Sequence, residues 1–132
     1  MPSAAAVLRP APSRVLVLDD DHLLLEVMRE MLDACGECEI VLESDARQAL
    51  ARLDAAMPDL LICDLMLPEM DGIEFLQAAA GLGYDGKVIL LSALEDEVRV
   101  AAEELARALG LQVVGSFRKP LLPEQLRDVL EC

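Results

Sequence analysis

Acidic, hydroxyl and amine side chains follow short apolar runs at four points of this sequence. Asp19, Asp20 and Asp21 come after the first run, Asp64 after the third, Ser92 after the fourth and Lys119 after the fifth. Carboxylates that crowd into one place repel each other unless a cation lies among them. Ligands that are all oxygen favour a hard ion, and Mg²⁺ suits a site that keeps water ligands and shares phosphate oxygens.

The other two side chains suit a phosphoryl group beside such a cation. Lys119 offers a compact positive charge to one phosphoryl oxygen, and Ser92 can donate a hydrogen bond to another. Phosphoryl transfer depends mainly on positioning and on neutralising charge. One carboxylate would be the nucleophile, and the product would be an acyl phosphate on aspartate.

The elements that must position these residues are strands alternating with helices from Arg14 onward. Short, mostly uninterrupted apolar runs are typical of strands that are buried on both faces of a sheet. The expected strands are Val15–Leu18, Ile40–Leu42, Leu60–Cys63, Val88–Leu91 and Gln112–Ser116. The alternation predicts a parallel sheet with helices on both faces. Because chemistry in such sheets lies beyond the carboxyl ends of the strands, the four points should share one edge.

Helical periodicity predicts a helix after each strand. The first ends before Gly36, the second covers Asp45–Asp54, the third ends at Gly81, the fourth ends before Gly110 and the fifth begins near Pro123. Asp21 is expected to cap the first helix. The faces expected to meet the core are Leu24, Met28, Met31 and Cys35 in the first helix and Leu94, Val98, Ala101, Leu105 and Leu109 in the fourth.

Length and charge limit the classes of protein to consider. The chain has 132 residues, 55% of them apolar, which suits one domain with a substantial core. Residues 1–13 hold three prolines and no clear period, so we expect a flexible leader before a domain at 14–132. The net charge of −14 disfavours direct binding to nucleic acid or membrane. No apolar run approaches the roughly 20 residues of a membrane span, and a cytoplasmic location is expected.

Four motifs together carry a family resemblance. Val-Leu-Val-Leu-Asp-Asp-Asp, Ile-Cys-Asp-Leu-Met-Leu-Pro-Glu-Met-Asp-Gly, Leu-Leu-Ser-Ala and Arg-Lys-Pro-Leu occur in this order between about Arg14 and Leu130. This region resembles the receiver domain of two-component response regulators. The resemblance implies an α/β, flavodoxin-like (CheY-like) fold. That fold is a doubly wound, five-stranded parallel sheet in the order 2-1-3-4-5, with helices on both faces.

The resemblance also assigns roles to individual residues. Asp64 matches the phosphoacceptor, Lys119 the phosphate-contacting lysine and Ser92 the switch hydroxyl. Mg²⁺ would be the cofactor, and the Lys119–Pro120 bond would be cis. The metal ligands would be Asp19, Asp20, Asp64 and the backbone carbonyl of Met66.

A phosphorylation-dependent signalling switch is the function that the resemblance implies. A histidine kinase or phosphotransfer protein would supply the phosphoryl group. The face formed by the fourth helix, fifth strand and fifth helix would then change, to control an output domain or partner. A homodimer through that face is compatible with the resemblance.

The stretch before Lys119 is also similar to receivers that precede cyclic-diguanylate phosphodiesterase domains. Many receivers have an aromatic residue three positions before the lysine, where this chain has Ser116; Phe117 should point to the opposite side of the strand.

Three other functions compete with this one. Cys35 and Cys38 form a CxxC pattern, but a redox pair belongs at the start of a helix and this one follows a helix. A small phosphohydrolase with an aspartyl-phosphate intermediate would use two first-strand aspartates separated by one residue, whereas Asp19 and Asp20 are adjacent. A phosphorylation-independent interaction module would not need the complete site. We therefore expect no enzyme activity beyond self-phosphorylation and slow autodephosphorylation.

Overall fold

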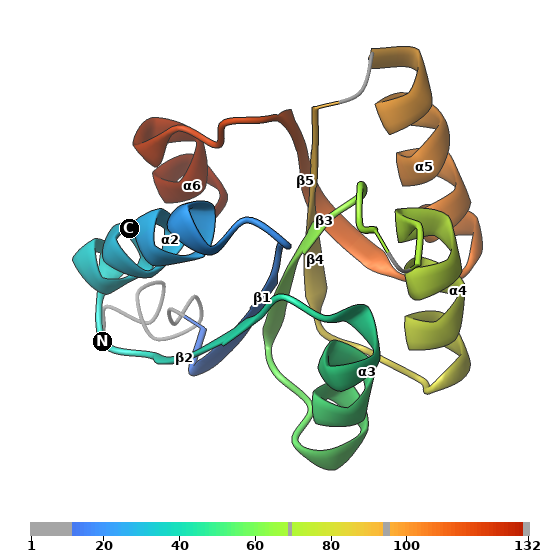
Figure 1. Cartoon of the computed structure of the whole chain (residues 1–132), viewed down its shortest axis with the longest axis horizontal. Helices are drawn as coiled ribbons and strands as arrows, with labels where there is room; N and C mark the ends of the chain where they lie inside the picture. The colour runs from blue at the N-terminus through green and yellow to red at the C-terminus, as the bar shows by residue number, and fades with distance from the viewer. Residues whose placement is uncertain (1–11, 69, 94–95, 131–132) are drawn as a thin grey trace, which may run out of the picture.

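The computed structural model describes residues 12–68, 70–93 and 96–130 (Figure 1). Residues 1–11 of the expected leader lie outside the described residues, as does Leu94 of the fourth helical face. Within the described ranges, no helix is both long and apolar enough to cross a membrane.

Strands and helices alternate throughout the described chain. The strands are β1 (Arg14–Leu18), β2 (Glu39–Glu43), β3 (Leu60–Asp64), β4 (Lys87–Ser92) and β5 (Gln112–Arg118). The helices are α2 (His22–Cys35), α3 (Ala46–Ala55), α4 (Gly72–Gly81), α5 (Asp96–Ala108) and α6 (Pro123–Leu130). Every predicted strand is present. The observed strands extend slightly past the apolar runs because the polar residues that border a run still take part in strand pairing.

The strands form one parallel sheet in the order β2-β1-β3-β4-β5. Helices α2 and α6 cover one face, and α3, α4 and α5 cover the other (Figure 1). The fold class expected from the sequence is confirmed. The winding reverses between β1 and β3, which is where α/β sheets of this kind bind their ligands.

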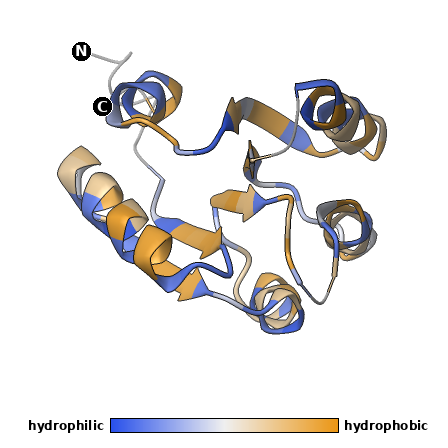
Figure 2. Ribbon diagram, turned by 45° about the horizontal axis from the view of Figure 1, so that its top comes forward, coloured by the Kyte–Doolittle hydropathy of each residue, from blue (hydrophilic) through white to orange (hydrophobic). Residues whose placement is uncertain are grey.

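Alternating strand residues feed two separate cores. Leu16 and Leu18 of β1 pack toward α3, α4 and α5, whereas Val15 and Val17 pack toward α2 and α6. The hydrophobic strands lie between the two helical layers in Figure 2. Burial of each large aliphatic side chain contributes roughly 1.5–3 kcal/mol, so the two cores together hold the sheet rigid. A rigid sheet fixes the edge at which the polar residues stand.

The predicted core face of α5 is wrong. Val98 is 49% exposed and Ala101 is also exposed, whereas Ala102 and Ala106 are buried. The two small alanines bring this helix against the sheet, so the larger aliphatic side chains lie beside the contact rather than in it.

The face of α2 also differs from the prediction. Its buried residues are Leu25, Met28 and Leu32. Leu24 and Met31, which we expected in the core, are only partly buried. The helix packs on β1 and β2 and also contacts α6, so its buried face is set by three neighbours rather than by one.

Candidate functional site

Side chains from four strands meet at the carboxyl edge of the sheet. Asp19 follows β1, Asp64 ends β3, Ser92 ends β4 and Lys119 follows β5. Asp19, Asp64 and Ser92 are buried, while Asp20 is exposed. The structure therefore brings together all of these residues, as the strand ends predict.

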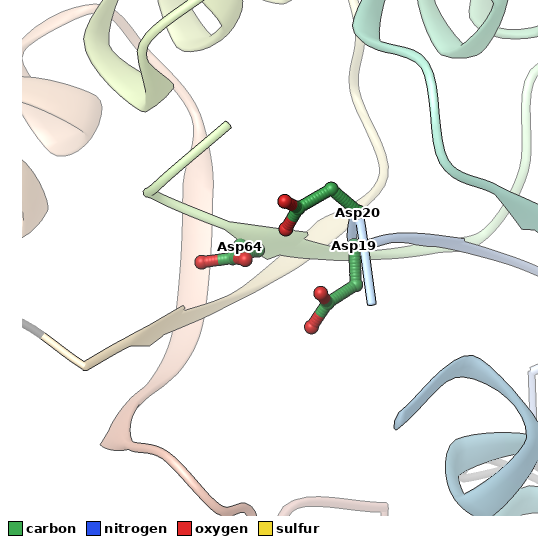
Figure 3. A group of neighbouring side chains, drawn as sticks. All are labelled: Asp19, Asp20 and Asp64. Carbon is green, nitrogen blue, oxygen red and sulfur yellow. The ribbon is translucent and has the colours of Figure 1, made fainter. Parts of the chain in front are cut away.

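The three aspartates form a carboxylate cluster with Lys119 beside it. Asp19, Asp20 and Asp64 can each offer an oxygen within 4.8 Å of the others (Figure 3). The ammonium Nζ of Lys119 lies 2.9 Å from Oδ2 of Asp19 and 3.0 Å from Oδ2 of Asp64. One ammonium faces three carboxylates, so the cluster keeps an excess of negative charge.

Asp21 belongs to the helix rather than to the cluster. Its Oδ1 accepts hydrogen bonds from the backbone N–H groups of Leu23 (2.9 Å) and Leu24 (3.3 Å), which cap α2 as predicted. The N–H of Asp21 in turn donates to Oδ1 of Asp19 at 2.9 Å. The start of α2 thus orients one carboxylate of the cluster.

The loop after β3 orients the Asp64 carboxylate. The backbone N–H of Met66 donates to Oδ1 of Asp64 at 2.9 Å. The loop folds back so that the N–H of Gly72 donates to the carbonyl of Leu65 at 3.0 Å. A Cβ on Gly72 would lie 2.6 Å from the Leu65 Cα, so only glycine allows this approach.

Ser92 and Lys119 are tied through the backbone. The N–H of Lys119 donates to the carbonyl of Ser92 at 2.9 Å. The Lys119–Pro120 peptide bond is cis, as the resemblance implied. Ser92 and Lys119, the two residues expected to contact a phosphoryl group, therefore lie next to each other at the carboxyl ends of the neighbouring strands β4 and β5.

Burial and neighbouring charges have opposite effects on the pKa of Asp64 and of Lys119. Burial raises the pKa of the Asp64 carboxyl above its ordinary value, although the Met66 amide and the Lys119 ammonium favour its ionised form. Burial alone would lower the pKa of Lys119, but its hydrogen bonds to Asp19 and Asp64 outweigh burial and raise that pKa. Lys119 therefore stays charged at neutral pH, and an added cation would favour the ionised form of Asp64.

Comparison with known proteins decides the family. A model of the response regulator receiver domain matches residues 15–131, which is nearly the whole chain. The chain belongs to this family. The motifs that suggested the resemblance lie inside the matched region and, in the structure, at one edge of the receiver sheet.

Curated relatives of this receiver domain are longer proteins. Response regulator MprA of Mycolicibacterium vanbaalenii is 34% identical over 115 residues, 87% of this chain and 47% of that protein. Cyclic di-GMP phosphodiesterase RocR of Pseudomonas aeruginosa is 32% identical over 117 residues, 88% of this chain and 30% of that protein. The chain thus spans less than half the length of these relatives.

Solved structures agree with the fold. A response regulator from Colwellia psychrerythraea has a TM-score of 0.78 and 32% identity, covering 90% of this chain and 94% of that chain. Chemotaxis protein CheY4 of Vibrio cholerae has a TM-score of 0.75 and 27% identity, covering 92% and 98%. Together with the family match, these relatives identify this receiver domain as a phosphorylation-dependent switch of two-component signalling.

The receiver departs from the common pattern at Ser116, and the structure shows what surrounds it. The guanidinium of Arg99, on α5, donates to the carbonyl and to Oγ of Ser116 at 2.9 and 3.0 Å. The ring of Phe117 points the other way, as predicted, and packs with Val129 of α6 in the second core. Sequence reasoning missed Arg99, because nothing in its helical spacing marks a partner in a strand.

The cysteine pattern does not have the environment of a redox pair. Cys35 is the last residue of α2 and is disulfide-bonded, whereas Cys38 is a free thiol, so the two cysteines of the pattern are not bonded to each other. Burial, and secondarily the charge of Asp33, raise the pKa of the Cys38 thiol. A redox thiol needs a lowered pKa, so the environment of Cys38 does not favour the CxxC chemistry that we considered.

Proposed function

We propose that Asp64 accepts a phosphoryl group from a histidine kinase or phosphotransfer protein. The observation that carries the proposal is the position of Lys119, whose Nζ lies within 3.0 Å of both Asp64 and Asp19. Asp20 supplies a further carboxylate to the same cluster. In this arrangement the carboxylate nucleophile lies beside the Lys119 ammonium. The cluster still carries more negative than positive charge, so it can bind a further cation.

The cluster fits Mg²⁺ as the cofactor. Its donors are all oxygens, which a small hard cation prefers, and a divalent charge would offset the excess of carboxylate. The residues that would hold the ion are Asp19, Asp20 and Asp64, together with the backbone carbonyl of Met66. When bound, Mg²⁺ neutralises charge on the phosphoryl oxygens during transfer.

The chain's own residues provide the rest of the reaction. An oxygen of Asp64, oriented by the Met66 amide, attacks phosphorus. The phosphorus–nitrogen bond of a donor phosphohistidine that is protonated on its other ring nitrogen breaks, and neutral imidazole leaves with that proton. Lys119 exchanges its contact with the Asp64 carboxylate for one with a phosphoryl oxygen, and the Ser92 hydroxyl donates to another. The product is an acyl phosphate on Asp64.

The output of the switch is a separate protein or domain. The receiver would act through the surface of α5, β5 and α6, and a homodimer through this surface would be one form of output. RocR, a cyclic di-GMP phosphodiesterase, is one relative in which a matching segment is part of a larger protein. A cyclic-diguanylate phosphodiesterase is therefore one candidate for the output of this receiver. The net charge of −14 leaves direct contact with nucleic acid to another domain or a partner.

Labelling with acetyl phosphate and Mg²⁺ tests the assignment of Asp64. Intact mass spectrometry should show one added phosphoryl group on the parent and none on Asp64→Asn. Asp54→Asn, at an exposed position of α3, is the matched control and should be labelled like the parent. Equal labelling of Asp64→Asn would overturn the assignment. Release of many phosphates per protein molecule would favour the phosphohydrolase instead.

A further inference from the structure

Arg99 joins helix α5 to strand β5 through a short hydrogen-bonded clamp, which we define as Arg99, Ser116 and Asp96. One guanidinium nitrogen donates to both the carbonyl and Oγ of Ser116, at 2.9 and 3.0 Å. The other lies 3.3 Å from Oδ1 of Asp96, one turn earlier in the same helix. The clamp therefore fixes the start of α5 against the edge strand of the sheet.

Burial leaves one polar atom of the clamp without a partner. The Arg99 side chain is only 17% exposed, and its Nε is shielded from solvent without a hydrogen-bond partner among the described residues. A buried donor without a partner loses the hydrogen bonds that water would give it. An alternative arrangement in which the guanidinium reaches water regains those bonds. The unpartnered Nε therefore weakens the clamp, whereas the two hydrogen bonds to Ser116 oppose its release.

The clamp also lies close in sequence to Ser92, a residue of the proposed phosphorylation site. Ser92 ends β4, and α5 begins a few residues later at Asp96. Leu90 of β4 pairs with Ser116, and Ser92 pairs with Arg118. A movement of Ser92 toward Asp64 would therefore act close to the start of α5 at Asp96, while Ser116 stays in register with Leu90 of β4. Such a movement changes the separation of the two halves of the clamp.

We propose that Arg99 is a positioning residue that holds the α5–β5 surface in its resting arrangement and releases Ser116 when Asp64 is phosphorylated. This inference rests on the proposed function. It says which contact transmits phosphorylation of Asp64 to the α5–β5 surface. It gives Ser116 the role that an aromatic side chain has in many receivers. Because coupling between two sites is reciprocal, loss of the clamp must also favour phosphorylation.

Comparison of Arg99→Ala with Arg107→Ala tests the proposal. Arg107 lies on the same helix, but its ion pair among the described residues is with Glu103 of that helix, at 2.8 Å, so its loss leaves the clamp intact. Beryllofluoride, a mimic of the phosphoryl group, should bind about fivefold more tightly or more to Arg99→Ala, which is the lower end of typical coupling, and with unchanged affinity to Arg107→Ala. Hydrogen exchange in residues 112–118 should rise in Arg99→Ala without phosphorylation. The parent should show that rise only with beryllofluoride.

Two further variants keep the test decisive if Arg99→Ala does not fold. Ser116→Ala removes the Oγ acceptor alone and should tighten beryllofluoride binding less than Arg99→Ala would. Arg99→Lys keeps the charge but cannot bridge both acceptors and should behave like Ser116→Ala. If the parent is labelled and all clamp variants match Arg107→Ala in beryllofluoride affinity and in hydrogen exchange, the clamp proposal is wrong while the proposed function stands. If the parent is not labelled, both fail.

Discussion

The Asp64 carboxylate is buried at the end of β3, yet it is also the group proposed to react. Burial disfavours its charge, and the Met66 amide and Lys119 ammonium offset that effect. Hydrogen bonds aim one oxygen at the loop and the other at Lys119. A nucleophile held in this way needs little reorganisation when phosphorus approaches, and this is how a small protein contributes to phosphoryl transfer.

At the same scale, Cys38 gives a prediction about pH. Its thiol pKa is raised, so a smaller fraction is thiolate at neutral pH than in an ordinary cysteine. Iodoacetamide should therefore modify Cys38 more slowly than a small-molecule thiol at pH 7, and the rate should increase as the pH rises. Mass spectrometry of digested protein would measure this rate. Faster modification than the free thiol at pH 7 would restore the redox hypothesis.

Among the elements, the loop between β3 and α4 positions the site through a close backbone contact. Leu65 donates its N–H to the carbonyl of Leu91 at 2.8 Å and accepts from Gly72. The loop is thereby fixed to β4 on one side and to the start of α4 on the other. Asp71 caps the same helix by accepting from the N–H of Glu74 at 2.8 Å. The Met66 amide is held toward Asp64 by this framework.

Gly72→Ala should disturb that framework. The added Cβ would lie 2.6 Å from the Leu65 Cα, so the loop must shift, and we expect a loss of roughly 1–3 kcal/mol in the free energy of unfolding. Phosphorylation of Asp64 should slow as well, because the Met66 amide moves. Urea denaturation would measure the first effect and acetyl phosphate labelling the second.

Gly81→Ala is the matched control, in the same helix. A Cβ at Gly81 meets nothing within 4 Å, so alanine should be neutral or stabilise the protein by up to about 1 kcal/mol. Equal loss of stability in the two variants would show that the close contact at Leu65 is not the cause.

For the whole molecule, the dominant feature is the net charge of −14. Self-repulsion of that size opposes the compact state and weakens as salt screens it. Part of the repulsion is local, because Asp19, Asp20 and Asp64 lie together with one ammonium. Diffuse and local repulsion should respond differently to a divalent cation.

Thermal unfolding in matched salts would separate the two contributions. NaCl should raise Tm modestly, and MgCl₂ at the same ionic strength should raise it further, because an ion bound only to the folded state stabilises that state. In Asp20→Asn the extra effect of MgCl₂ should disappear, while Tm without Mg²⁺ should rise because one repelling charge is gone. An equal response to the two salts in the parent would contradict the metal site.

The residues of the site were predictable from the sequence for a simple physical reason. Parallel strands place all their carboxyl ends at one edge, so polar residues that follow successive apolar runs must meet there. Asp19, Asp64, Ser92 and Lys119 meet this condition through local sequence alone. The strands and the cap at Asp21 are equally local, and the structure confirms them.

Only the tertiary structure decided what depends on neighbours distant in sequence. The buried face of α5 follows from how closely Ala102 and Ala106 approach the sheet, which periodicity does not encode. The partner of Arg99 is fixed by the distance and angle between a helix and a strand, since a long, flexible side chain can reach many acceptors. The sequence therefore determined the site at the strand ends, whereas packing determined the clamp by which we propose that the site is connected to the surface.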